Sequence, residues 1–145
     1  MKGNQFDVVE VGKVVNDYED EIPNDYKERV VKIKIHEDYT DCLLHLEEHS
    51  HIVVFMWFHQ SDREIQQVHP MGNLDNPLTG VFATRSPVRP NPIAATVCEL
   101  VRREGNVLHV KGLDALNGTP VIDIKSYPSR YAIEDPIYPD WIDDR

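Results

Sequence analysis

The sequence predicts a small, mainly β fold, an antiparallel single-sheet β-barrel with one or two short helices. Two observations point to it. Short apolar or alternating runs are separated by turn residues, and no helices of about 10–15 residues alternate with them, which speaks against a doubly wound sheet. A sandwich of the same strands is the alternative architecture. With 145 residues, we expect a single domain over residues 1–145 with a core of its own.

Five segments carry the strand pattern. Residues 30–36 alternate Val31, Ile33 and Ile35 with polar residues, a period of two. HIVVFMWF, residues 51–58, is a continuous apolar run and predicts a strand buried on both faces. The other segments are 91–101, with Thr96, Cys98 and Leu100 on one face; 106–113, with Leu108 and Val110 opposite His109 and Lys111; and 120–127, with Ile122 and Ile124 opposite Asp123 and Lys125.

Turns and one helix join these strands. Gly105-Asn106 and Asn117-Gly118 are turn signals. Residues 40–50 are the helical candidate, with Thr40 or Asp41 as N-cap and with Leu43, Leu44 and Leu46 facing inward. Residues 80–83 predict a further apolar strand.

Composition narrows the function classes. The formal net charge of -10 argues against general, non-specific nucleic-acid binding, although it leaves room for a local basic patch. No apolar run approaches the length of a membrane span, so we expect no membrane partner. The N-terminal residues lack the apolar stretch of a signal peptide. We therefore expect Cys42 and Cys98 to be reduced thiols and the protein to be cytoplasmic.

A histidine-rich segment could hold a metal. It comprises Cys42, His45, His49 and His51, and a helix would place His45 and His49 on one face. The spacing matches no standard zinc ligand set, and His51 lies beyond the expected helix. We expect no metal here, and a metal-dependent hydrolase is kept as an alternative function.

Two other segments offer polar groups next to apolar strands. Trp57-Phe58-His59-Gln60 ends a strand with two hydrogen-bonding side chains, or is core followed by a polar loop. Residues 84–92, TRSPVRPNP, hold Arg85, Arg89, Asn91 and three prolines. Prolines stiffen the chain, and arginines suit carboxylates or phosphates. The segment is either a binding loop or a crossover whose arginines form surface ion pairs.

Three ordered motifs resemble one known family. GVFATRSPVRPNPI (residues 80–93), LEEHSHIVVFMWFHQ (46–60) and GLDALNGTPVIDIKSY (112–127) are similar to the signature segments of the TrmO family of tRNA methyltransferases, also called TsaA-like or YaeB. VHPMGNLDNPLTG (68–80) is similar to the archaeal branch. The likeness covers most of the chain. The chain differs from the family pattern at Asn24, Asp25, Met71, Asn117 and Ser126.

The resemblance implies a β-barrel homodimer that uses S-adenosyl-L-methionine to methylate N6 of threonylcarbamoyladenosine beside the tRNA anticodon. By motif position, cofactor contacts fall on residues from five segments: Pro23, Asn24 and Asp25; His59 and Gln60; Arg85; Ala95; and Leu113, Asp114, Ala115 and Leu116.

Chemistry suggests roles for further residues. A weakly nucleophilic nitrogen reacts more readily if it loses its proton during attack, and Asp123 is our candidate base. Lys125 shares its strand face and could hold it ionised or bind an anion. We expect Arg89 to take part in catalysis, and Arg85, Arg89, Asn91 and Tyr127 to bind substrate. The second alternative function is a SAM-binding protein that methylates a small molecule or senses SAM.

Overall fold

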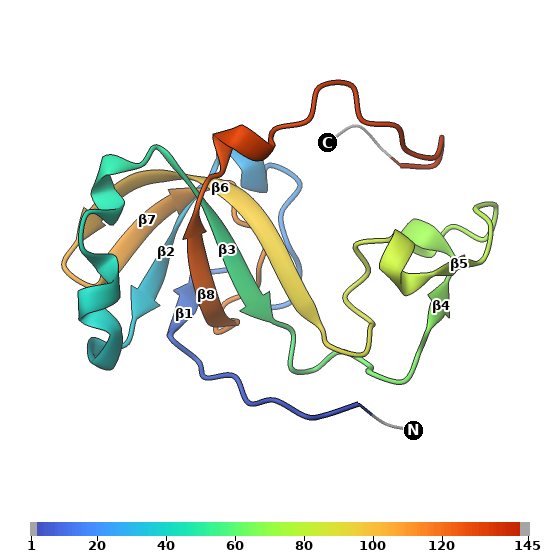
Figure 1. Ribbon diagram of the computed structural model, residues 1–145, viewed down its shortest axis with the longest axis horizontal. Coiled ribbons are helices and arrows are strands. Elements are labelled where there is room, and N and C mark those ends of the chain that lie inside the picture. Colours follow the sequence, from blue (N-terminus) through green and yellow to red (C-terminus); the bar gives the residue numbers. More distant parts are fainter. Residues whose placement is uncertain (1–2, 143–145) are drawn as a thin grey trace. The chain divides into compact units, whose positions relative to one another are not determined.

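Six antiparallel strands close into a barrel, in the order β1-β2-β7-β6-β3-β8 with β8 paired back to β1 (Figure 1). The computed structural model describes residues 3–142. The barrel strands are β1 (Gly12–Val15), β2 (Val30–Ile35), β3 (His51–Trp57), β6 (Ile93–Glu104), β7 (Val107–Lys111) and β8 (Pro120–Ser126). The predicted single-sheet antiparallel barrel is confirmed, and the sandwich is wrong.

The alternation of side chains builds the barrel core. Residues at every second position of each strand point to the same side of a sheet, and here the inward positions are apolar. Val14, Ile33, Ile52, Val54, Met56, Leu108, Val110 and Val121 are all completely buried. Burial of this much apolar surface is the main stabilisation of such a fold.

Strand β3 is buried on one face only. Ile52, Val54 and Met56 are fully buried, whereas Val53, Phe55 and Trp57 on the other face are half-buried. The expectation of burial on both faces is therefore wrong. The three side chains Val53, Phe55 and Trp57 make the outer side of β3 apolar.

Close approaches in the barrel require glycine. A Cβ on Gly12 would lie 2.6 Å from the Lys34 carbonyl oxygen on the neighbouring strand. At the predicted turn between β6 and β7, Gly105 has φ of 58°, a left-handed conformation that glycine adopts readily.

Short 3-10 helices replace the predicted helix at residues 40–50. They are η2 (Glu37–Leu43) and η3 (Leu46–Glu48), and His45 between them has φ of 69°. This left-handed residue interrupts the helix. Leu43 is buried and Leu46 packs on the core, as predicted, but Leu44 is 73% exposed and does not face inward. His36, not Thr40 or Asp41, is the N-cap of η2.

The remaining barrel-side helix is η1 (Tyr26–Glu28). No helix in the part of the chain that the structure describes is long and apolar enough to cross a membrane. Cys42 is exposed and Cys98 is buried, and both are free thiols, as expected.

The chain divides into two compact units, the barrel unit (residues 1–58 and 93–127) and a second unit (59–92 and 128–145). The second unit contains a small sheet of β4 (Gln67–Val68) and β5 (Thr79–Gly80), and the 3-10 helices η4 (Pro70–Gly72), η5 (Val81–Ala83) and η6 (Ser129–Tyr131). Residues 80–83 are thus mostly a 3-10 helix, and the predicted strand there is wrong.

Candidate cofactor and substrate site

The barrel unit holds most of the predicted site residues, and segment 113–116 is the best defined. Leu113 and Ala115 are each 1% exposed and anchor the segment in the core, while Asp114 faces solvent. Buried and exposed side chains thus alternate along this segment, and Asp114 is on its outer side. The segment is thereby fixed in place, although it belongs to no strand.

Hydrogen bonds hold this segment through its acceptor groups. Asn16 Nδ2 donates to the Ala115 carbonyl at 2.8 Å, and Thr96 Oγ1 donates to Asp114 Oδ1 at 2.7 Å. Thr119 Oγ1 donates to the Leu116 carbonyl at 2.7 Å. By contrast, none of the hydrogen bonds between described residues has a backbone N–H of residues 113–116 as its donor. Backbone donors need partners, so this segment has donors left for a bound molecule.

Segment 23–25 lies next to helix η1 in the same unit. Tyr26 N donates to the Pro23 carbonyl at 3.1 Å, which closes the turn. The Asp25 carboxylate accepts a 2.8 Å hydrogen bond from Arg29 Nε, and this bond raises the pKa of Arg29. Gly112 N donates to the Arg29 carbonyl at 3.2 Å, so η1 is joined to the chain directly before segment 113–116.

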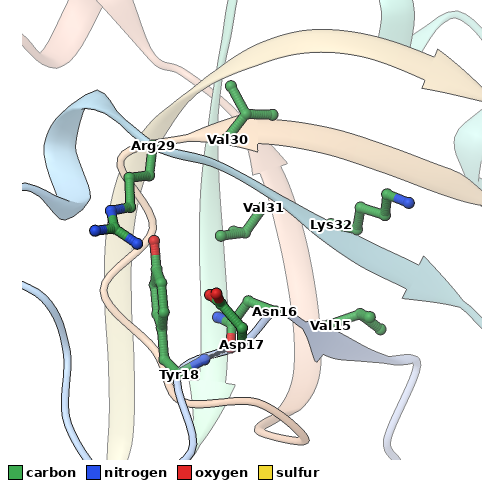
Figure 2. A pocket seen from close by; sticks show the side chains of 8 residues that line it. All are labelled: Val15, Asn16, Asp17, Tyr18, Arg29, Val30, Val31 and Lys32. Carbon is green, nitrogen blue, oxygen red and sulfur yellow. Dashed lines mark hydrogen bonds between the residues drawn. The ribbon is translucent and has the colours of Figure 1, made fainter.

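A hollow of about 560 Å³ lies beside Arg29. Its walls are Val15, Asn16, Asp17, Tyr18, Arg29, Val30, Val31 and Lys32. Figure 2 shows the Arg29 guanidinium next to the Tyr18 hydroxyl. The Tyr18 side chain is buried, its hydroxyl has no hydrogen-bond partner among the described residues, and burial raises the pKa of Tyr18. We did not predict this hollow, because Asn16, Tyr18 and Arg29 belong to none of the motifs.

Asp123 and Lys125 both face outward on β8. They lie opposite Phe55 and Val53 of β3. The Asp123 carboxylate accepts a 2.9 Å hydrogen bond from the amide of Ile124. No ion pair between Asp123 and Lys125 occurs among residues 3–142. Their shared face is confirmed, and their roles stay predictions.

Beside Asp123, the outer sides of β3 and β6 carry apolar side chains. The outer positions of β3 and β6 pair as Val53 with Val97, Phe55 with Ala95 and Trp57 with Ile93. Ile93 is 42% exposed and Val97 49% exposed. Tyr127, half-exposed, lies 6.3 Å from the His51 ring. Ala95, a predicted cofactor contact, is therefore part of this outer apolar face.

The second unit holds residues 84–92, the arginine-proline loop, and hydrogen bonds from Arg89 stabilise this loop. Arg89 Nη1 donates to the carbonyls of Ser86 at 3.0 Å and Thr84 at 3.3 Å. Arg89 N also donates to the Asp62 carbonyl at 3.1 Å. Part of the donor capacity of Arg89 thus fixes the loop instead of facing a ligand.

A second arginine, which sequence reasoning missed, also stabilises this loop. Arg63 Nε donates to the Pro90 carbonyl at 2.7 Å, and its Nη2 donates to Asn91 Oδ1 at 3.1 Å. Asn91 is thereby oriented. His59, Gln60 and Arg85 lie in the same unit and are exposed. A loop stiffened by prolines and by two arginines is suited to present Arg85 and Asn91 in fixed positions.

The histidine segment forms no metal site. The left-handed conformation of His45 breaks the helix that would have aligned it with His49. No group of three or more His, Cys, Asp or Glu side chains within the described residues could hold a metal ion. The predicted helix face is wrong.

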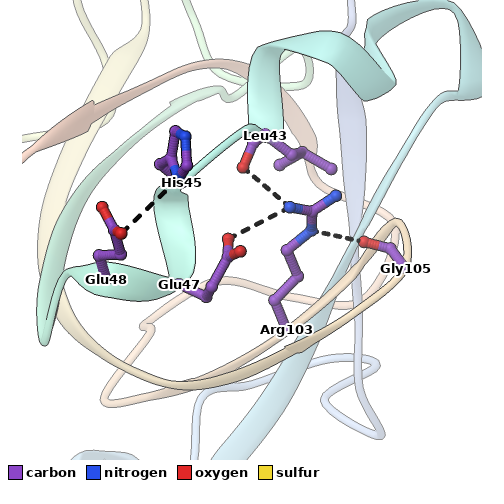
Figure 3. A network of polar contacts seen from close by, with 6 residues as sticks. All are labelled: Leu43, His45, Glu47, Glu48, Arg103 and Gly105. Atoms are coloured by element: carbon purple, nitrogen blue, oxygen red, sulfur yellow. Dashed lines mark hydrogen bonds and ion pairs between the residues drawn. The ribbon is translucent and has the colours of Figure 1, made fainter.

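Two arginines that could have joined a basic patch are committed elsewhere. Arg102 forms an ion pair with Glu104. Arg103 donates to the carbonyls of Leu43 and Gly105 and to Glu47, which fastens the 3-10 helices to the β6–β7 hairpin (Figure 3). Arg103 is thereby used within the fold.

The fold is a small closed β-barrel with short 3-10 helices. A family model described as the tRNA-methyltransferase O N-terminal domain matches residues 19–132. The chain belongs to this TrmO family, as its motifs indicated.

Named relatives and solved structures agree with this family assignment. The chain is 43% identical to a "Probable S-adenosyl-L-methionine-binding protein" of Pyrococcus horikoshii, over 90% of this chain and 89% of the relative. It is 37% identical to the Homo sapiens tRNA (adenine(37)-N6)-methyltransferase, over 70% of this chain and 23% of the relative. The crystal structure of TrmO from P. aeruginosa superimposes with a TM-score of 0.76 at 26% identity, covering 96% of this chain and 62% of that one. The chain thus spans less than two thirds of that structure.

Proposed function

We propose that this protein transfers a methyl group from S-adenosyl-L-methionine to N6 of threonylcarbamoyladenosine next to the tRNA anticodon. Family membership makes the chain a methyltransferase that uses S-adenosyl-L-methionine. The observation that supports the cofactor assignment in the molecule itself is segment 113–116. The Ala115 and Leu116 carbonyls and the Asp114 carboxylate accept hydrogen bonds within the protein, whereas none of the segment's backbone N–H groups donates one among residues 3–142.

The cofactor residues fit the group they would hold. The adenine and ribose of the cofactor offer acceptors for backbone N–H groups, which segment 113–116 supplies. The methionyl carboxylate calls for a cation, and Arg85 is the candidate, with His59 and Gln60 of the same unit as further polar contacts. When bound, the cofactor supplies an electrophilic methyl group on a sulfonium.

The chain's residues then have to align the acceptor nitrogen and remove its proton. In the transfer, the N6 nitrogen would gain the methyl group and lose its proton, and the sulfur would keep the electrons of the carbon–sulfur bond as a neutral thioether. We assign the departing proton to the Asp123 carboxylate. Lys125 lies on the same strand face, and we assign it to an anionic group of the substrate. Arg89, Asn91 and Tyr127 are assigned to the substrate, with the threonine carboxylate as the target of Arg89.

The outer apolar face of β3 and β6 supports a homodimer. Half-exposed Val53 and Phe55 lie beside exposed Val97 and Ile93, and an apolar patch on one protein is a common mark of an interface. A two-fold axis through such a face would bury it against its own copy. A reaction on tRNA and two free cysteines are in keeping with a cytoplasmic protein.

A methyl-transfer assay tests the function. The protein is incubated with labelled S-adenosyl-L-methionine and with tRNA that carries or lacks threonylcarbamoyladenosine. We expect label only in the modified tRNA, and a loss of at least about 100-fold in rate for Asp123→Asn. Glu99→Gln, an exposed carboxylate on β6, is the matched control. Equal transfer to both tRNAs would contradict the assignment of Arg89 to the threonine carboxylate. No transfer to either tRNA would contradict the proposed reaction.

A further inference from the structure

Four lysines gather on one outer face of the barrel. We call the outer side of β1, β2 and β7 the lysine face, and it consists of Lys13, Lys32, Lys34 and Lys111. Lys32 and Lys34 are two residues apart on β2 and so share a face. Lys13 pairs directly with Lys34 across β1 and β2, and Lys111 pairs with Val30, which lies on the same face of β2 as Lys32. The register therefore brings all four side chains to one side.

This concentration of charge contrasts with the rest of the molecule. The chain carries 25 acidic residues and a net charge of -10. Yet β1, β2 and β7 contain no Asp or Glu. Like charges directly opposite on neighbouring strands destabilise a sheet, so the Lys13–Lys34 pair works against folding. The face is better explained by an anionic partner than by stability.

The ion pairs around the lysine face are weak and lie at its edges. Lys13 Nζ is 4.0 Å from Glu10, and Lys111 Nζ is 3.6 Å from Glu28. Such exposed pairs contribute little to stability and can be exchanged for phosphates. Among residues 3–142, no ion pair involves Lys32 or Lys34. Lys32 acts only at longer range, where it helps to lower the pKa of Glu104 after the larger effect of Arg102.

The lysine face leads to the proposed cofactor segment. Lys111 ends β7, and Gly112 binds the Arg29 carbonyl one residue before segment 113–116 begins. On the other side, Lys32 also lines the hollow beside Arg29 and Tyr18 (Figure 2). An anionic polymer bound to the lysines therefore reaches both segment 113–116 and the hollow within the barrel unit.

We propose that the lysine face of β1, β2 and β7 binds the phosphate backbone of the RNA substrate. The assignment rests on the proposed tRNA function and names the surface that it would use. Lysines act as point charges for phosphates without reading base sequence, which suits an enzyme whose specificity comes from one modified nucleoside. It also explains how a protein of net negative charge can hold RNA: binding relies on this face.

The test measures the affinity of the full chain for tRNA between about 50 and 200 mM salt. For Lys34→Gln we expect the slope of log affinity against log salt to fall by about one unit. For the triple variant Lys13→Gln, Lys32→Gln, Lys34→Gln we expect a fall of about three units and a Kd at least about tenfold higher. Lys27→Gln, an exposed lysine on η1 outside the three strands, is the matched control and should leave the slope unchanged. Lys34→Arg should retain it.

Two readouts separate binding from folding and from chemistry. The triple variant should melt no lower than the wild type, because it loses a like-charge repulsion. Its affinity for S-adenosyl-L-methionine, measured by calorimetry, should not change. A parallel titration with polyglutamate asks whether the face takes acidic polypeptides instead, and binding of that polymer but not of tRNA would overturn the proposal.

The outcomes distinguish this surface from the proposed reaction. Wild-type protein that methylates tRNA with a salt slope unchanged in the triple variant overturns the lysine face and leaves the reaction standing. Lysine-dependent tRNA binding without methyl transfer supports the lysine face and counts against the reaction. Wild-type protein that binds no tRNA overturns both.

Discussion

The side-chain amide of Asn16 donates a 2.8 Å hydrogen bond to the carbonyl of Ala115, a residue 99 positions further along the chain. Asn16 Oδ1 in turn accepts from the amide of Tyr18 at 2.9 Å. One side chain thus joins the end of β1 to the hollow residue Tyr18 and to the proposed cofactor segment. The position of that segment depends on a residue outside every recognised motif.

Replacement of Asn16 should weaken both folding and cofactor binding. Asn16→Ala leaves a buried carbonyl without its donor, and we expect a loss of about 1–3 kcal/mol in the free energy of unfolding. The matched control is Asn106→Ala, whose Nδ2 donates to Thr40 Oγ1 at 2.8 Å and to the Ile35 carbonyl at 3.2 Å. Both variants should melt earlier in thermal denaturation, but only Asn16→Ala should bind S-adenosyl-L-methionine less tightly. Equal affinity in the two variants would show that Asn16 does not position segment 113–116.

Arg85 should contribute to cofactor affinity. We expect S-adenosyl-L-methionine to bind with micromolar strength, about -8 kcal/mol, and Arg85→Ala to lose at least about 1.4 kcal/mol, a factor of ten. Calorimetry provides the measurement. Arg102→Ala is the control, since that arginine pairs with Glu104 on the barrel surface and should leave the affinity unchanged. An Arg85→Ala variant with wild-type affinity would contradict the assignment.

The outer apolar face should hold the homodimer together. Val97→Asp places a charge among Val53, Phe55 and Ile93, and burial of an unpaired charge is costly. Light scattering at micromolar concentration should give a dimer for the wild type and a monomer for this variant. Val15→Asp, an exposed valine on β1, should stay dimeric. A monomeric wild type with cofactor present would end the proposal, and loss of the dimer in both variants would move the interface elsewhere.

The two cysteines should differ sharply toward thiol reagents. Burial raises the pKa of Cys98 to about 12, with Asp114 adding to the effect, and only the thiolate reacts. Below that pH Cys98 stays a neutral thiol, whereas Cys42 is exposed. Titration at pH 8 should label one thiol in the native chain and both in denaturant. Native Cys42→Ser should show none, and rapid labelling of that variant would mean that the barrel opens or that Cys98 is less buried.

The barrel was predictable because its signals are local. Alternation in residues 30–36 and the Gly105-Asn106 turn each follow from neighbouring side chains, and the strands β2 and β7 formed where expected. The helix at 40–50 failed for a long-range reason. Arg103 on β6 binds the carbonyl of Leu43 and the carboxylate of Glu47, and the chain turns at His45 between them. No sequence window contains both partners.

In the candidate site, too, local motifs were predictable and contacts between distant residues were not. Motif positions led to segment 113–116, but the groups that fix it lie far away in the sequence, on Asn16 directly after β1 and on Thr96 of β6. Arg63 was missed because its partners Pro90 and Asn91 lie 27 and 28 residues away. The lysines of β2 were seen as the polar half of an alternation, and only the pairing with Lys13 and Lys111 reveals that they form one face.

The closure of the barrel between β1 and β8 has a consequence for how the protein is made. The strands pair Gly12 with Val121 and Lys13 with Pro120, and proline has no N–H to donate. Val11 N and Val14 N add hydrogen bonds to the carbonyls of Val121 and Thr119 at 2.8 and 3.0 Å. A ribosome delivers β1 before, and β8 after, every other barrel strand, so the nascent chain carries an open sheet until β8 has been made. Open edges invite pairing with other chains. We therefore expect the barrel to close only once residue 126 has left the ribosome exit tunnel, and we expect chains released before β8 to depend on chaperones and to be cleared by proteases.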